Sequence, residues 1–177
     1  SILAPTYDDE KIFKNYEIWN EKKLNKNISG EIFEKYKIKE VDFIDNDFII
    51  NKKNFKNSDF FDEKIFMYFE TMDFCRRARN LNKKIYVCDE IKFTHFGGQS
   101  VDPKFSFLTS LNRNWHYNWA KFYYFNKHFG YFFALRKILP NLFRSLRRML
   151  LAKIKKNHND YLLFKAEFSG IINAIFN

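Results

Sequence analysis

The sequence predicts an α/β protein: a partial mixed sheet with helices over residues 1–102, then a helical, basic C-terminal region over residues 103–177. Short apolar segments of strand length recur before residue 100, and one segment near residue 74 has helical spacing. After residue 103, aromatic and aliphatic residues recur at three- and four-residue steps among many cations. A chain of 177 residues has the length of one domain and can bury a real core.

The first fifty residues supply two predicted strands. Ile2-Leu3-Ala4-Pro5 is a short apolar strand that ends at its proline, which lacks an amide donor. Residues 8–40 are rich in Lys, Asn and Glu, and we expect a loose, solvent-facing insertion there with one or two short helices. Val41–Ile50 is the next predicted strand. Its period of two puts Asp45 and Asp47 on one face, directed toward a site or toward solvent.

The stretch 60–100 organises the rest of the chain, and helical spacing begins inside it. Thr71 is the predicted N-cap, Glu70 precedes it at the mouth of the helix, and Asp73 lies in the first turn, where the helix dipole favours an anion. The predicted inner face is apolar and consists of Phe74, Cys75, Ala78 and Leu81. The predicted outer face carries three arginines, Arg76, Arg77 and Arg79.

Two short strands are predicted after this helix, at Lys84–Cys88 and Ile91–His95. Gly97-Gly98 allows the backbone to turn tightly directly after the second strand. The two cysteines, Cys75 and Cys88, lack the spacing of a metal site, so we expect reduced, buried thiols in a cytosolic protein.

Four carboxylates in the same stretch are interleaved with aromatic residues: Asp62, Glu63, Glu70 and Asp73. Carboxylates in such surroundings are either paired or have shifted pKa values, because desolvation disfavours the charged form. The residues alone leave two interpretations open. Carboxylates at a helix N-terminus are commonly caps, and a single histidine after a strand is commonly structural; the same groups can also serve a catalytic cleft.

The C-terminal region is predicted as three helical segments. Phe105–Phe129 is a long helix with a stripe of four aromatic residues, for which core packing is the simplest explanation: Trp115, Trp119, Phe122 and Tyr123. Gly130 ends this helix, and Pro140 is expected to kink or restart the next one. Tyr161–Phe176 is a last apolar helical segment.

The middle segment of this region is a basic amphipathic helix. Its predicted apolar face consists of Leu135, Ile138, Leu139, Leu142, Phe143, Leu146, Met149, Leu150 and Ile154. Arginines and lysines mostly occupy the opposite face. Such a helix suits a membrane interface, with apolar side chains at the acyl boundary and cations at anionic headgroups. The alternative is a helix packed on its own domain with a solvated basic face.

The formal net charge of +10 is concentrated in this region. Between Pro103 and Asn159 there are twelve Lys or Arg and no Asp or Glu, whereas residues 1–102 carry 18 basic and 19 acidic residues. This asymmetry favours an anionic membrane surface as a partner. Nucleic acid is not expected, because the cations share a helix with a broad apolar face and no nucleic-acid motif accompanies them. With no signal peptide and no run of about 20 apolar residues, we expect a cytoplasmic protein that is peripheral on the inner face of the cell membrane.

Four motifs in the stretch 60–100 carry a resemblance to a known family. They are Phe61-Asp62-Glu63, Phe66-Met67-Tyr68-Phe69-Glu70, Asp73-Phe74-Cys75-x-Arg77 and His95-x-Gly97-Gly98-x-Ser100. In this order and spacing they resemble family 2 glycosyltransferases of the rhamnosyltransferase-like branch. The resemblance covers about residues 2–130 and implies the acceptor-side half of a GT-A catalytic domain.

This resemblance implies an inverting transfer of a sugar from a nucleotide-sugar donor to a glycan or lipid-linked acceptor, as in cell-surface polysaccharide biosynthesis. A divalent cation, Mn²⁺ or Mg²⁺, would assist. The resemblance implies catalytic roles for Glu70 and Asp73, and a metal or diphosphate contact for His95. Substrate-binding roles follow for Asp62, Glu63, Tyr68, Arg77 and Trp115, with a structural ion pair as the alternative for Arg77.

The sequence departs from the family in two places. Thr71 stands where the family carries the Asp that is commonly the general base, so Glu70 is the carboxylate left for that role. The family's Asp-x-Asp metal motif belongs to its nucleotide-binding half, and we interpret neither Asp45-Asn46-Asp47 nor Asp8-Asp9 as that motif. The chain begins at Ser1 without an initiator Met. We therefore expect an incomplete enzyme that binds its cation only with the missing half; the alternative is a non-catalytic membrane- or acceptor-binding module.

Overall fold

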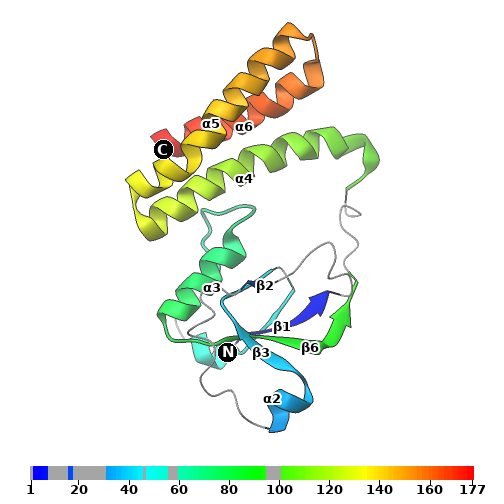
Figure 1. Cartoon of the computed structure of the whole chain (residues 1–177), viewed down its shortest axis with the longest axis vertical. Coiled ribbons are helices and arrows are strands. Elements are labelled where there is room, and N and C mark those ends of the chain that lie inside the picture. The colour runs from blue at the N-terminus through cyan, green and yellow to red at the C-terminus, as the bar shows by residue number, and fades with distance from the viewer. Residues whose placement is uncertain (1, 8–15, 18–30, 46, 56–59, 95–100) are drawn as a thin grey trace. The chain divides into compact units, whose positions relative to one another are not determined.

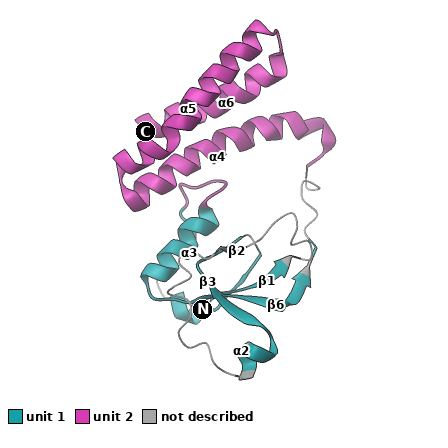
Figure 2. Ribbon diagram, in the orientation of Figure 1, with its two compact units in different colours: residues 1–62, 70–97 teal, residues 63–69, 98–177 magenta. Residues whose placement is uncertain are grey.

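The protein consists of two compact units, shown in Figure 2. The computed structural model describes residues 2–7, 16–17, 31–45, 47–55, 60–94 and 101–177. Residues 1–62 and 70–97 form the first unit, and residues 63–69 and 98–177 form the second. The sequence predicts a division after residue 102, whereas the structure divides the chain after Gly97 and assigns the segment 63–69 to the second unit.

A four-stranded mixed sheet forms the centre of the first unit, in the strand order β3-β6-β1-β5 (Figure 1). Its strands are β1 (Ile2–Tyr7), β3 (Ile38–Val41), β5 (Ile49–Ile50) and β6 (Ile85–Phe93). β1 and β6 pair in parallel, and β3 and β5 pair antiparallel to their neighbours. A separate two-stranded sheet pairs β2 (Tyr16–Glu17) with β4 (Phe43–Ile44). The predicted α/β class with a mixed sheet is confirmed.

The pairing of β1 with β6 corrects two predictions. β1 does not end at Pro5 but continues through it. β5 pairs only with Ile2 and Leu3, so it does not need the amide that Pro5 lacks. The pairing with β6 shifts register directly after Pro5. The two strands predicted on either side of Asp89 are one strand, β6. The register shift pairs Pro5 with Cys88 and Thr6 with Lys92, so β6 keeps its direction while the intervening residues form a bulge.

The predicted strand Val41–Ile50 is wrong, because these residues fall into three short strands, β3, β4 and β5. The interruption centres on Asp42, which is 1% exposed between β3 and β4. Its carboxylate forms an ion pair with Arg79. A buried carboxylate needs such a partner. Asp47 is exposed and Asp45 is half-buried, and neither lies in a strand.

The helix α3 (Glu70–Asn80) covers the core of the first unit. Phe74, Cys75 and Ala78 are buried as predicted, and the Phe74 ring lies among the rings of Phe48, Phe55, Phe60 and Phe61 at centroid distances of 5.5–6.2 Å. The prediction that Leu81 shares this face is wrong: Leu81 is exposed, because the helix ends at Asn80 before Leu81 completes the turn. Of the predicted outer face, Arg77 is half-buried and Arg79 is exposed, and both form ion pairs.

Short helices connect these elements. The predicted insertion 8–40 contains α2 (Glu31–Lys35), while residues 8–15 and 18–30 lie outside the described residues. A 3₁₀ turn, η1 (Lys52–Phe55), brings Phe55 into the core.

The second unit is built from three long helices that pack on one another, preceded by a short turn, η2 (Pro103–Phe105). They are α4 (Ser106–Phe129), α5 (Tyr131–Ile154) and α6 (His158–Phe176). The three predicted helical segments are confirmed. Gly130 separates α4 from α5 with φ 86°, a conformation that favours glycine. The prediction that Pro140 restarts the helix is wrong, because α5 continues through it.

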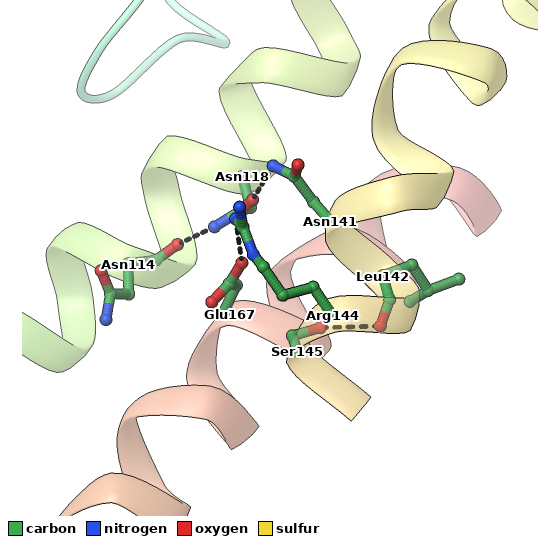
Figure 3. Close-up of polar contacts among 7 residues, drawn as sticks. All are labelled: Asn114, Asn118, Asn141, Leu142, Arg144, Ser145 and Glu167. Atoms are coloured by element: carbon green, nitrogen blue, oxygen red, sulfur yellow. Dashed lines mark hydrogen bonds and ion pairs between the residues drawn. The ribbon is translucent and has the colours of Figure 1, made fainter. Parts of the chain in front are cut away.

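Polar contacts tie these helices together, as Figure 3 shows. Glu167 of α6 is 9% exposed and accepts a hydrogen bond from Nη2 of Arg144 on α5 at 3.2 Å. Asn141 of α5 donates to Asn118 of α4 at 3.4 Å. The pKa of Lys121 is lowered by burial and, next, by the charge of Arg144. The buried carboxylate of Glu167 is thus matched by cations from both neighbouring helices.

None of the helices in the described part of the chain has the length and apolar character needed to cross a membrane.

Candidate functional site

Glu70 is the first residue of α3, and its carboxylate is the candidate functional group of the first unit. Its Oε2 is buried and has no hydrogen-bond partner among the described residues. Burial raises the pKa of Glu70, and the nearby charge of Asp45 raises it further, while a hydrogen bond from the backbone of Glu70 opposes both. A partly desolvated carboxylate without a partner for one oxygen has an increased affinity for a proton. This is the property of a general base or acid.

The prediction that Thr71 is the N-cap is wrong, because α3 begins one residue earlier, at Glu70. Thr71 therefore lies inside the first turn, where its side chain is buried. Its hydroxyl cannot replace a carboxylate as a base near neutral pH. Glu70 is thus the carboxylate directly before Thr71 at this helix start.

Asp73 and Arg77 form a buried ion pair one helical turn apart. Nε of Arg77 lies 2.7 Å from Oδ2 of Asp73, whose side chain is fully buried. Nη2 of Arg77 donates to the carbonyl oxygen of Phe60 at 2.7 Å. This arrangement connects the first turn of α3 to the segment that precedes it. Asp73 therefore helps to hold α3 in its orientation, and Arg77 serves as the structural ion-pair partner of Asp73.

Tyr68 and Phe69, which directly precede Glu70 in the chain, both have left-handed backbone angles, with φ 66° and 63°. Two consecutive non-glycine residues in this region cost roughly 1–2 kcal/mol each. Aromatic packing within the second unit compensates: Tyr68 meets the edge of Tyr117, and Phe69 contacts both Tyr117 and Tyr124 at 5.5 Å. Such strain is concentrated at functional positions in proteins.

The remaining predicted residues are distributed over both units. Asp62 is half-buried at the end of a segment of the first unit. Glu63 is exposed and belongs to the second unit, as do Tyr68 and Trp115. Trp115 of α4 stacks on Trp119 with an interplanar angle of 10°, and Trp119 stacks in the same way on Tyr123. These three stacked, half-buried rings belong to the predicted aromatic stripe.

His95, together with Gly97, Gly98 and Ser100 of the same motif, lies outside the described residues. Within the described ranges, no group of three or more His, Cys, Asp or Glu is arranged to hold a metal ion.

Sequence reasoning missed the properties of two polar residues in the first unit. Asp45 was placed on a strand face directed toward a site or toward solvent, but its electrostatic effect on Glu70 was not predicted. Thr6 of β1 is 2% exposed, and its Oγ1 has no hydrogen-bond partner among the described residues. The signal for Thr6 was its position: in a strand with a period of two, it follows Ile2 and Ala4 on the buried face.

Comparison with family models, with curated proteins and with solved structures finds no match to this chain. The likeness to family 2 glycosyltransferases therefore rests on the four motifs of the stretch 60–100.

Proposed function

We propose that this chain provides the acceptor side of an inverting glycosyltransferase and that Glu70 is its general base. The observation that carries the proposal is the half-buried Glu70 carboxylate at the start of α3, with a raised pKa and an Oε2 lacking a partner among the described residues. The four motifs that surround this residue in the sequence supply the reaction class. The donor is a nucleotide-sugar, and the acceptor is a glycan or a lipid-linked sugar.

The chemistry assigned to Glu70 is a single proton transfer. An acceptor hydroxyl attacks the anomeric carbon of the donor, the bond from that carbon to the diphosphate breaks, and the configuration inverts. Glu70 takes the hydroxyl proton as the new glycosidic bond forms. A raised pKa makes Glu70 a stronger proton acceptor than an exposed glutamate. A divalent cation, when bound, would neutralise the departing diphosphate.

Asp73 is a positioning residue in this proposal. Its ion pair with Arg77, and the bond from Arg77 to Phe60, hold the first turn of α3 in place. A general base must lie within hydrogen-bond reach of the proton that it removes, so the orientation of this turn sets the rate.

The decisive experiment compares Glu70→Gln with the wild type in a transfer assay on the full-length enzyme, in which this chain is joined to the nucleotide-binding half. Nucleoside diphosphate release is measured with a panel of nucleotide-sugars, glycan and lipid-linked acceptors, and Mn²⁺ or Mg²⁺. Loss of a general base lowers the rate by roughly 10²–10⁴-fold. Glu34→Gln, an exposed glutamate of α2, is the matched control and is expected to change the rate by less than about twofold. A Glu70→Gln rate within threefold of wild type would remove Glu70 as the base.

Thr71 favours a second candidate, a non-catalytic acceptor-binding module, because the family's usual base is missing at this position. The same assay separates the two functions. The module would show no donor turnover and no saturable donor binding with Mn²⁺, while retaining saturable binding of an acceptor glycan by calorimetry.

A further inference from the structure

We propose that α5 binds an anionic phospholipid surface through its exposed side, which we call the α5 outer face. This face consists of six exposed apolar residues, Phe132, Phe133, Phe143, Leu150, Leu151 and Ile154. Two exposed arginines, Arg136 and Arg147, lie among them on the helix surface. The proposal concerns the second unit and does not depend on the role of Glu70.

The α5 outer face lies opposite the side of the helix that packs in the second unit. The packed side includes Ala134, Ile138, Ser145 and Ala152, at spacings of four and seven residues. By contrast, Phe132 is 85% exposed, Phe143 65% and Ile154 76%. Exposed apolar surface of this extent marks an interaction site.

The positive charge of α5 favours an anionic partner. The helix carries six cations and no Asp or Glu: Arg136, Lys137, Arg144, Arg147, Arg148 and Lys153. Arg144 is engaged by Glu167, whereas Arg136, Arg147 and Arg148 are exposed. Cations interspersed with exposed apolar side chains match anionic headgroups above an acyl boundary, because long arginine side chains can extend from the apolar layer to the headgroups. A nucleic acid would leave the six apolar side chains in water, so it fits this face less well.

The shape of the face agrees with a flat interface. The 24 residues of α5 span about 36 Å at 1.5 Å per residue, and the apolar positions extend from the second residue of the helix to its last. A helix lying in the interface plane immerses such a stripe by about 5–10 Å along its whole length.

A cavity of about 300 Å³ lies where the α5 outer face ends. Its lining includes Lys153, Lys156, His158 and Tyr161, at the turn between α5 and α6. The turn is a Schellman motif: Asn157 N–H donates to the carbonyl of Ala152 and Lys156 N–H to that of Lys153, with Lys156 in the left-handed region. The motif places the side chains of Lys153, Lys156 and His158 around this space, at the end of α5.

Vesicle sedimentation tests the proposal with the full chain. The protein is expected to sediment with vesicles containing phosphatidylglycerol and to bind pure phosphatidylcholine vesicles far more weakly. Each cation near an anionic surface contributes about 1 kcal/mol, which corresponds to about fivefold in partitioning. Arg136→Gln/Arg147→Gln is therefore expected to weaken binding more than tenfold, and added salt to weaken wild-type binding. Lys52→Gln/Lys53→Gln, exposed cations of η1, are the matched control and are expected to retain wild-type binding.

A second variant tests the apolar part of the face. Phe143→Asp/Ile154→Asp is expected to abolish sedimentation with phosphatidylglycerol vesicles, while Leu108→Asp, at a similarly exposed apolar position on α4, is expected to retain it. Circular dichroism and the thermal midpoint confirm folding of every variant. Equal binding to neutral and anionic vesicles, or wild-type binding by Phe143→Asp/Ile154→Asp, would overturn the proposal. So would a concentration-dependent dimer in light scattering that this variant abolishes, because the face would then belong to a second copy of the chain.

Discussion

Arg77 and Asp73 form a largely buried ion pair on α3, with 2.7 Å between Nε and Oδ2, and the same guanidinium donates to the carbonyl of Phe60. The pair thus connects α3, which begins at Glu70, with Phe60 in the segment before the helix. It supports both the stability of the first unit and the geometry of the candidate base.

Arg77→Met is expected to destabilise the first unit by about 3 kcal/mol, because the buried Asp73 carboxylate loses its ion pair. Urea unfolding followed by circular dichroism measures the change. Lys52→Met, which removes an exposed cation of η1, is expected to change stability by less than about 0.5 kcal/mol. A loss below about 1 kcal/mol in Arg77→Met would show that the pair is not a structural tie.

A double-mutant cycle tests the ion pair between Asp42 and Arg79. Asp42 is 1% exposed at the break between β3 and β4, so either single change, Asp42→Asn or Arg79→Met, is expected to be destabilising. The double variant is expected to lose less than the sum, with a coupling free energy of about 1–3 kcal/mol. Additive losses would mean that the two side chains contribute to stability independently and not as an ion pair.

Gly170→Ala is expected to destabilise the helices of the second unit by about 2–3 kcal/mol. A Cβ at this position would lie 2.4 Å from the backbone oxygen of Trp115, so α4 and α6 would have to separate. Ser169→Ala is the control on the same helix. Gly130→Ala provides a contrast: it meets no atom within 4 Å, and its cost of about 1 kcal/mol comes from φ 86° alone. Thermal unfolding distinguishes the three variants.

Cys75 is expected to be inert in the folded protein. Burial raises the pKa of its thiol to about 12 from the ordinary 9.0, which lowers the thiolate fraction near neutral pH by about a thousandfold. Iodoacetamide labelling at pH 7.5, read by mass spectrometry of peptides, should modify this residue only after guanidinium is added. Rapid labelling of Cys75 in the native protein would show that the core around Phe74 opens readily.

Glu70 gives stability a specific pH dependence. Its folded pKa is raised above the ordinary 4.5, so the stabilisation associated with its protonated form is present below about pH 4.5 and is lost as the pH rises through the folded pKa. Glu70→Gln is therefore expected to be more stable than wild type at neutral pH and not at pH 4. Because the side chain is only half-buried, screening keeps the difference below about 1 kcal/mol. Thermal midpoints across pH 4–8 test this, with Glu34→Gln showing no such trend.

Local pattern was sufficient for the helices. The spacing of Phe74, Cys75 and Ala78 predicted α3 and its buried face, and the repeats after residue 103 predicted α4, α5 and α6. Gly130 marked a true helix boundary because few other residues adopt its φ. These features depend on interactions within about four residues of the chain, which a sequence pattern records directly.

Strand boundaries required the tertiary structure. Pro5 remains in β1, whose neighbour β5 pairs only with Ile2 and Leu3, and Val41–Ile50 is interrupted at Asp42, which forms an ion pair with Arg79 of the distant helix α3. The two strands predicted around Asp89 form one strand, because the residues between them form a bulge where the pairing with β1 shifts register. Each outcome depends on a partner far away in the sequence.

By itself, the sequence determined which segments are helical, where charge accumulates and which carboxylates gather near residue 70. Tertiary structure decided which of those carboxylates lacks a partner for a buried oxygen among the described residues, and which apolar residues of α5 are exposed. The physical reason is that helical periodicity is a local property, whereas desolvation and ion pairing depend on every element that surrounds a side chain. Glu70 and Asp73 lie three residues apart in the same turn, yet only Asp73 has Arg77 beside it.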